Sequence, residues 1–131
     1  MKKIIAILLF AFFLTGYSCF AQVHVVGGLA TYKFWAGEDP DSTKTIINGE
    51  YWTFGHFTKE YKLYMEIKVR PALAKYFITD NNLKPGKYRM SSEAPKWFRP
   101  PKNFEVWMGS QESMYYINTK TGYIYMHEVQ L

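Results

Sequence analysis

Histidine is the side chain that most readily binds a metal ion or moves a proton near neutral pH, and this chain has three: His24, His56 and His127. Metal sites usually repeat their ligands at short spacings such as H-x-x-x-H, whereas these three residues lie far apart in the sequence. His56 and His127 stand near aromatic residues in segments that we interpret as strands. We therefore expect both to be packed or edge residues, and we expect neither a metal site nor a cofactor.

Acidic residues offer two further kinds of chemistry. The loop 38–42 could supply oxygen ligands to calcium, but Pro40 interrupts it and the D-x-D-x-D-G order of an EF-hand is missing. Glycoside hydrolysis needs two carboxylates that face each other across a cleft, and Glu66 and Glu105 both lie in predicted strands. Glu66 falls on the polar side of its strand, where a carboxylate is ordinarily solvated. A small secreted hydrolase with such a pair is therefore an alternative function and not the first expectation.

The segment Ala94–Lys102 combines residue types that often anchor an interface. It places Trp97, Phe98 and Arg99 between prolines, which stiffen the backbone and lower the entropy lost on binding. Trp and Arg are enriched among the residues that dominate binding energies. We predict these three residues as a contact surface. The alternative is that Trp97 and Phe98 fold back and plug one end of the fold.

The N-terminal segment has the three-part layout of a secretory signal peptide. Lys2 and Lys3 precede an apolar run over residues 4–14, and a more polar stretch leads to Ala21. The apolar run is shorter than the roughly twenty residues that a membrane-spanning helix needs. We predict cleavage after Ala21 and a secreted or periplasmic protein of bacterial origin. A lipid-modified Cys19, as in outer-membrane lipoproteins, is the alternative.

Residues 22–131 have the size of one domain. Cys19 is the only cysteine, so this domain contains no disulfide, and its apolar core has to stabilise it. Four Trp residues and many Tyr and Phe residues supply that core. The formal net charge is +5, two units of which come from Lys2 and Lys3, and the other lysines are scattered. This pattern does not favour a nucleic-acid partner.

Alternation of apolar and polar residues predicts an antiparallel β fold. It is clearest over 61–69, and Asn48-Gly49 between apolar segments predicts a tight hairpin over 45–54. A second hairpin is predicted over 114–129, with its turn at 119–122, and further strands over 23–35 and 103–108. The segment Pro71–Thr79 is compatible with a helix that begins at Pro71 and equally with a β-favouring strand.

The motif Leu83-Lys84-Pro85-Gly86-Lys87-Tyr88 is the most specific in the domain. It resembles the L-x-P-G-x-Y tyrosine corner of fibronectin type III and immunoglobulin-like Greek-key sandwiches. The resemblance implies that the Tyr88 hydroxyl bonds to backbone just upstream, near residues 80–83, and has a role in architecture. About four strand segments follow Tyr88 here, where that family usually has about two.

We therefore expect an all-β, antiparallel Greek-key sandwich of about seven to eight strands, with a small closed barrel as the alternative. The expected function is that of a non-enzymatic binding or structural module of the bacterial cell envelope, with a protein or glycan partner. Besides the hydrolase, a barrel-type carrier of an apolar ligand is a further alternative.

Overall fold

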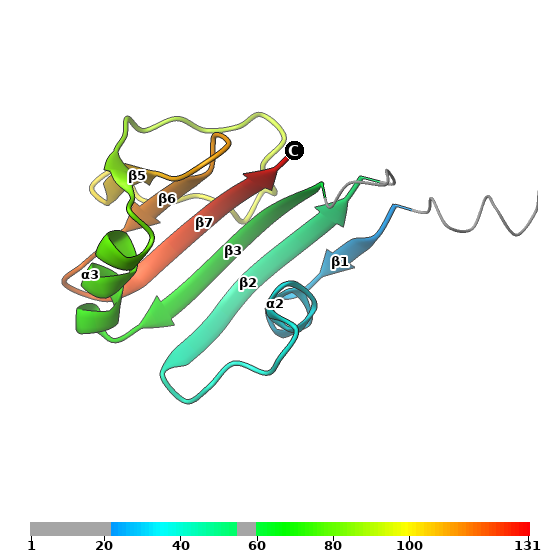
Figure 1. Ribbon diagram of the computed structural model, residues 1–131, viewed down its shortest axis with the longest axis horizontal. Helices are drawn as coiled ribbons and strands as arrows, with labels where there is room; N and C mark the ends of the chain where they lie inside the picture. Colours follow the sequence, from blue (N-terminus) through cyan, green and yellow to red (C-terminus); the bar gives the residue numbers. More distant parts are fainter. Residues whose placement is uncertain (1–21, 55–59) are drawn as a thin grey trace, which may run out of the picture.

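The computed structural model describes residues 22–54 and 60–131, which form seven strands and two helices (Figure 1). The strands are β1 (His24–Val26), β2 (Lys44–Thr53), β3 (Tyr61–Val69), β4 (Lys84–Pro85), β5 (Glu105–Met108), β6 (Met114–Ile117) and β7 (Tyr123–Gln130), and the helices are α2 (Gly28–Ala36) and α3 (Pro71–Asp80). The predictions for residues 1–21, including Cys19, and for His56 lie outside the described residues. Within the described residues, no helix combines the length and the apolar character needed to cross a bilayer.

All seven strands belong to one antiparallel sheet, in the order β1-β2-β3-β7-β6-β5-β4. Strands β4 to β7 form a meander, and the last of them returns to lie beside β3, which is a Greek-key connection. The predicted antiparallel all-β fold is thus confirmed. The sheet is open, with β1 and β4 as its edges, so it is not the closed barrel of the alternative.

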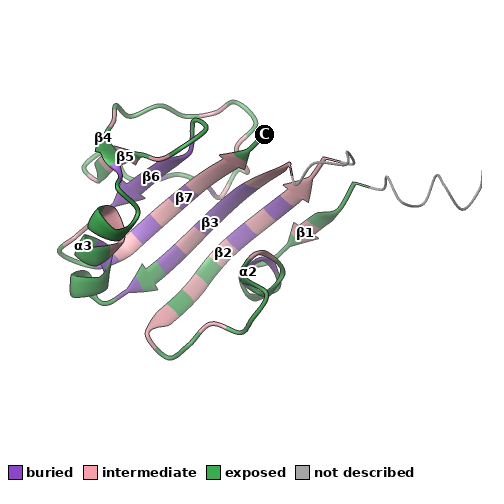
Figure 2. Cartoon of the chain, viewed as in Figure 1, coloured by how far each residue is buried: buried purple, intermediate pink, exposed green. Residues whose placement is uncertain are grey.

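One face of the sheet is covered by both helices. Alternation along β3 places Leu63, Met65 and Ile67 on this face. Alternate residues of β6 and β7 join them, namely Tyr115, Ile117, Ile124 and Met126. Side chains from both helices complete this core, namely Tyr32 and Trp35 of α2 and Ala74, Phe77 and Ile78 of α3. Figure 2 shows how the buried positions concentrate along the central strands.

The opposite face is covered by the long connection between β4 and β5. Phe98 from this loop packs on Tyr64 of β3, Tyr116 of β6 and Tyr125 of β7. Phe98, Tyr64 and Tyr116 are almost fully buried. The sheet therefore has two apolar faces, one beneath helices and the other beneath an irregular loop. Aromatic side chains, each of which buries a large area, supply most of the second face.

The predicted hairpin at Asn48-Gly49 is wrong, because β2 runs through this dipeptide without a turn. The pairing with β3 shifts register between Ile46 and Asn48, which marks an irregularity in the strand. Gly49 is buried beneath α2, where an added Cβ would lie 2.7 Å from the Cβ of Thr31. The glycine thus permits the close approach of a helix to the sheet.

The predicted strand over 23–35 is also wrong beyond its first residues. The chain pairs with β2 only over 24–26 and then forms α2. Tyr32 and Trp35 lie three residues apart, which places both on one side of a helix but on opposite sides of a strand. Burying both rings on the sheet favours the helix over the β propensity of the aromatic residues.

Two other predicted segments are confirmed, and the structure decides between the two interpretations of a third. The strand over 61–69 and the hairpin over 114–129 are present, with Gly122 in the turn at a φ of 85°. The segment from Pro71 is a helix, with the proline in its first turn and Arg70 extended before it. Its apolar side contributes Ala74 and Phe77 to the core.

Candidate functional site

A cleft lies on the helical face of the sheet and has a volume of about 550 Å³. Its floor consists of apolar side chains from the two central strands, namely Met65, Ile67 and Val69 of β3 and Ile124 and Met126 of β7. One wall carries Tyr32 and Trp35 of α2, and the other carries Leu73, Tyr76 and Phe77 of α3. Pockets that hold small ligands or side chains usually have this size and this mostly apolar lining.

The cleft exists because the two helices pack over different strands. Helix α2 lies on β2, close enough for Thr31 to touch Gly49. Helix α3 is fixed farther across the sheet, where the ring of Phe77 packs edge to face on Tyr115 of β6, with centroids 5.3 Å apart. Strands β3 and β7 lie between these contacts. Their apolar side chains therefore line the bottom of the cleft, where each is at most 8% exposed.

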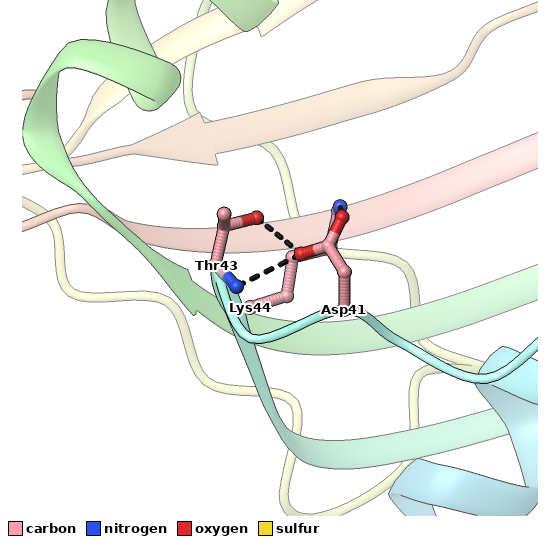
Figure 3. Close-up of polar contacts among 3 residues, drawn as sticks. All are labelled: Asp41, Thr43 and Lys44. Atoms are coloured by element: carbon pink, nitrogen blue, oxygen red, sulfur yellow. Dashed lines mark hydrogen bonds and ion pairs between the residues drawn. The ribbon is translucent and has the colours of Figure 1, made fainter.

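The rim of the cleft is charged and well ordered by local hydrogen bonds (Figure 3). The Oδ1 atom of Asp41 accepts hydrogen bonds from the backbone N–H of Thr43, at 2.8 Å, and from its hydroxyl. The Nζ atom of Lys44 lies 2.8 Å from Oδ2 of Asp41. The bond from Lys44, together with those from Thr43, lowers the pKa of Asp41 to about 2. Asp41 is therefore ionised at neutral pH and cannot serve as a general acid there.

Exposed apolar side chains extend the cleft beyond its floor. Tyr76 is 61% exposed and Leu73 is 37% exposed, although both are large and apolar or amphipathic. They stand on α3 at the mouth of the cleft. A partner that covers them would remove apolar surface from water, which is the main driving force of association.

The carboxylate pair of the hydrolase alternative does not come together. Glu66 is paired across the sheet with Tyr125 and accepts a hydrogen bond of 2.9 Å from Nδ2 of Asn48. Tyr125 lies on the face that the β4–β5 loop covers. Glu105 is opposite Ile117, whose side chain lies on the face that the helices cover. Directly opposed residues share one face of a sheet. Glu66 and Glu105 therefore lie on opposite faces and cannot act on one substrate.

A different carboxylate, Glu128, lies on the helical face near one end of the sheet. The hydroxyls of Tyr61 and Tyr115 both donate hydrogen bonds to it, the latter at 3.0 Å. Burial and the charge of Glu128 raise the pKa values of both tyrosines well above their ordinary value, so both hydroxyls keep their protons. This arrangement holds three strands together. Sequence analysis missed it because only the strand register reveals which face Glu128 occupies.

The loop predicted as a contact surface divides into buried and exposed residues. Phe98 is only 1% exposed and fills the aromatic core, as the plug alternative requires. Trp97 is half-buried against it, with ring centroids 5.8 Å apart. Arg99 is exposed. Of the three predicted residues, Trp97 and Arg99 therefore keep surface that a partner could contact.

Tyr88 binds a different part of the chain than the resemblance implies. Its hydroxyl donates a hydrogen bond of 2.8 Å to the carbonyl oxygen of Pro100. The acceptor lies downstream in the β4–β5 loop and not in the backbone near residues 80–83. Tyr88 thus fastens the loop that covers the second face of the sheet.

The two described histidines lie in separate places. His24 on β1 stacks on Trp52, with centroids 4.8 Å apart, and its Nε2 lies 2.8 Å from Oε1 of Glu50. His127 on β7 stacks on Tyr64 at 4.4 Å. Among the residues that the structure describes, no group of three or more His, Cys, Asp or Glu side chains is arranged to hold a metal ion.

Comparisons with protein-family models, with curated proteins and with solved structures found no match for this chain.

Sequence analysis did not find the cleft, although one signal was present. Tyr32 and Trp35, and likewise Leu73, Tyr76 and Phe77, follow helical spacing and are more apolar than surface helices require. Because the sequence predicts a strand over 23–35, the helical spacing of Tyr32 and Trp35 is easily overlooked. The walls of the cleft become visible only when both segments are helices on the same face.

Proposed function

We propose that this chain is an exported, non-enzymatic binding module of the bacterial cell envelope, and that it binds an apolar, aromatic-bearing segment of a partner protein in the cleft between α2 and α3. The observation that carries the proposal is the lining of the cleft. An apolar floor lies between aromatic walls, and large apolar side chains remain exposed at the mouth. Export rests on the signal-peptide pattern of residues 1–21 and predicts that the mature chain begins at Gln22, which an intact-mass measurement tests.

The chemistry of the cleft supports a protein segment over a polar ligand. The floor offers dispersion contacts to side chains such as Phe, Leu or Trp, which bury well against Met and Ile. The polar rim can orient the backbone of such a segment, because the ion pair of Asp41 and Lys44 is fixed at the edge. Asp41 is ionised at neutral pH and paired with Lys44, so it does not offer a general acid at this place.

Site-specific photocrosslinking in cells that export the full-length chain tests this function. A photoreactive benzoylphenylalanine at Tyr76 is expected to give one discrete crosslinked product, because Tyr76 lines the mouth of the cleft. The same amino acid at the neighbouring exposed Lys75, which does not line the cleft, is the matched control. Leu73→Glu should abolish the product, whereas Ala72→Glu on the exposed side of α3 should not.

Equal crosslinking from positions 75 and 76 would show that contact is not specific to the cleft. Persistence of the product in the Leu73→Glu variant would have the same meaning. Either result would reject the cleft as the binding site.

A further inference from the structure

Within residues 22–131, Lys and Arg together are concentrated in the segment 84–102, although the lysines alone look scattered along the chain. The segment contains one acidic residue, Glu93, and six cationic residues, namely Lys84, Lys87, Arg89, Lys96, Arg99 and Lys102. The remainder of 22–131 contains eight cationic and ten acidic residues. The net charge is therefore +5 on the segment and −2 on the remainder. Such an asymmetry suggests a negatively charged partner.

The fold brings the two arms of the β4–β5 loop together. The hydroxyl of Tyr88 in the first arm donates a hydrogen bond of 2.8 Å to the carbonyl oxygen of Pro100 in the second. The rings of Tyr88 and Phe98 both pack on Tyr116, at centroid distances of 5.3 and 6.1 Å. The cationic residues of the two arms are thus neighbours, namely Lys87 and Arg89 in the first arm and Lys96, Arg99 and Lys102 in the second.

The strand register places Lys84 on the same face of the sheet as this loop. Lys84 of β4 is opposite Met108 of β5, and Met108 is opposite Met114, which packs in the aromatic core beneath the loop. Directly opposed residues share one face of a sheet. The nearby Glu105 lies on the helical face and does not offset this charge directly.

Little of the positive charge is neutralised by neighbouring groups. All six cationic residues are exposed, and in the part of the chain that the structure describes none of them forms an ion pair. Glu93, the acidic residue of the segment, is paired with Lys62 of β3. Glu112 borders a small hollow together with Arg89 and offsets part of its charge. We call the six exposed cationic residues the basic surface.

Large apolar side chains are exposed within the basic surface. Tyr88 and Met90 are each 37% exposed, and Met108 is 39% exposed. Tyr88 and Met90 flank Arg89 in the chain, and Met108 lies opposite Lys84. Basic residues mixed with aromatic and apolar ones are typical of proteins that lie at the surface of a membrane. A partner that is only charged, such as a soluble polyanion, would leave these apolar side chains in water.

From these observations we infer that the basic surface binds the negatively charged head groups of a phospholipid membrane. Each Lys or Arg close to such a surface strengthens binding about fivefold. The net negative charge of the remainder is repelled by the membrane, so the molecule binds with the loop toward the lipid and the helical face away from it. The cleft between α2 and α3 then stays open to solvent. The inference depends neither on the cleft nor on export.

Co-sedimentation of the chain 22–131 with lipid vesicles tests this inference. One set of vesicles consists of neutral phosphatidylcholine, and the other also contains anionic phosphatidylglycerol. In about 0.1 M salt we expect the chain to sediment only with the vesicles that contain phosphatidylglycerol. In about 1 M salt, where the Debye length falls from about 10 to about 3 Å, this binding should be lost.

Two double variants with the same change in net charge locate the contact. Lys96→Gln with Arg99→Gln removes two charges from the basic surface and should weaken vesicle binding on the order of twentyfold, about fivefold for each residue. Lys75→Gln with Lys120→Gln removes two charges from α3 and from the β6–β7 turn and should leave vesicle binding unchanged. All four residues are exposed, so both variants should keep the fold.

Soluble phosphates distinguish a membrane from other sources of negative charge. Glycerol phosphate and a DNA duplex are added to the vesicle-bound chain at the phosphate concentration of the lipid, and we expect neither to release it. The inference is overturned if the chain does not bind the anionic vesicles, binds neutral vesicles equally well or binds independently of salt. It is also overturned if both double variants lose the same affinity, or if either soluble phosphate releases the chain.

Discussion

Replacing Phe98 by Ala should destabilise the protein severely, because this one side chain covers the second face of the sheet. Phe98 is 1% exposed, and its ring packs edge to face on Tyr64 and Tyr125 at centroid distances of 4.9 and 5.6 Å. Emptying a buried phenylalanine site costs about 3 to 5 kcal/mol. Each aromatic pair adds about 0.5 to 1.5 kcal/mol beyond the buried area. We therefore expect a loss in the upper part of that range, about 4 to 5 kcal/mol.

Such a loss is large relative to the total stability of a small domain, about 5 to 15 kcal/mol. It corresponds to a fall in the melting temperature on the order of 15 to 20 °C. Urea unfolding of the chain 22–131, followed by tryptophan fluorescence and circular dichroism, measures it. Phe98→Leu, which keeps most of the volume, should lose only about 1 to 2 kcal/mol.

Two neighbours on the same loop are matched controls. Arg99→Ala should change the free energy of unfolding by less than about 0.5 kcal/mol, because Arg99 is exposed. The loss of unfolding free energy in Trp97→Ala should lie between those of Arg99→Ala and Phe98→Ala, because Trp97 is half-buried against Phe98. If Phe98→Ala costs less than about 1 kcal/mol, the loop does not cover the sheet and our description of this core is incorrect.

Three further changes test other parts of the structure. Tyr88→Phe should cost about 1 kcal/mol in urea unfolding, because it removes the hydrogen bond to Pro100, and an unchanged midpoint would contradict that bond. The pKa of His127 is about 4 in the folded chain, below its ordinary value of 6.5. Between these pH values the imidazole is protonated in the unfolded chain but stays neutral in the folded chain. Stability should therefore fall as the pH decreases from about 6.5 to about 4, and His127→Gln should remove part of this slope. Gly122→Ala should cost at least about 3 kcal/mol, because its φ is 85° and a Cβ would lie 1.8 Å from a backbone oxygen. Gly37→Ala, at a φ of 75° in open space, should cost only about 1 kcal/mol, and equal losses would show that the contact at Gly122 does not matter.

The strands that could be predicted are those in which local pattern and tertiary position agree. The strand over 61–69 is central, and its alternation predicts which residues face the helices. The hairpin over 114–129 has a turn sequence that suits its Gly122. In both segments the apolar alternation and the turn residues favour the observed structure, so the sequence alone predicts it.

The segments that could not be predicted are those in which packing overrides local preference. Gly49 looks like part of a turn, yet it is a strand residue beneath Thr31 of α2. The aromatic residues of α2 favour a strand locally, but the helix buries Tyr32 and Trp35 together. Since the cleft depends on that helix, the error in the secondary structure also concealed the candidate site.

The methionine methyl groups offer the most direct test of the proposed binding cleft. Met65 and Met126 lie on its floor, whereas Met90 and Met114 border a smaller hollow on the other face of the sheet. In the chain 22–131 with labelled methionine methyls, N-acetylphenylalanine amide represents an aromatic side chain of a partner. We predict that it shifts the Met65 and Met126 signals in a saturable manner and leaves Met90 and Met114 unchanged. Shifts confined to Met90 and Met114, or no saturable shift at Met65 and Met126, would contradict the proposal that the cleft between α2 and α3 binds an apolar segment.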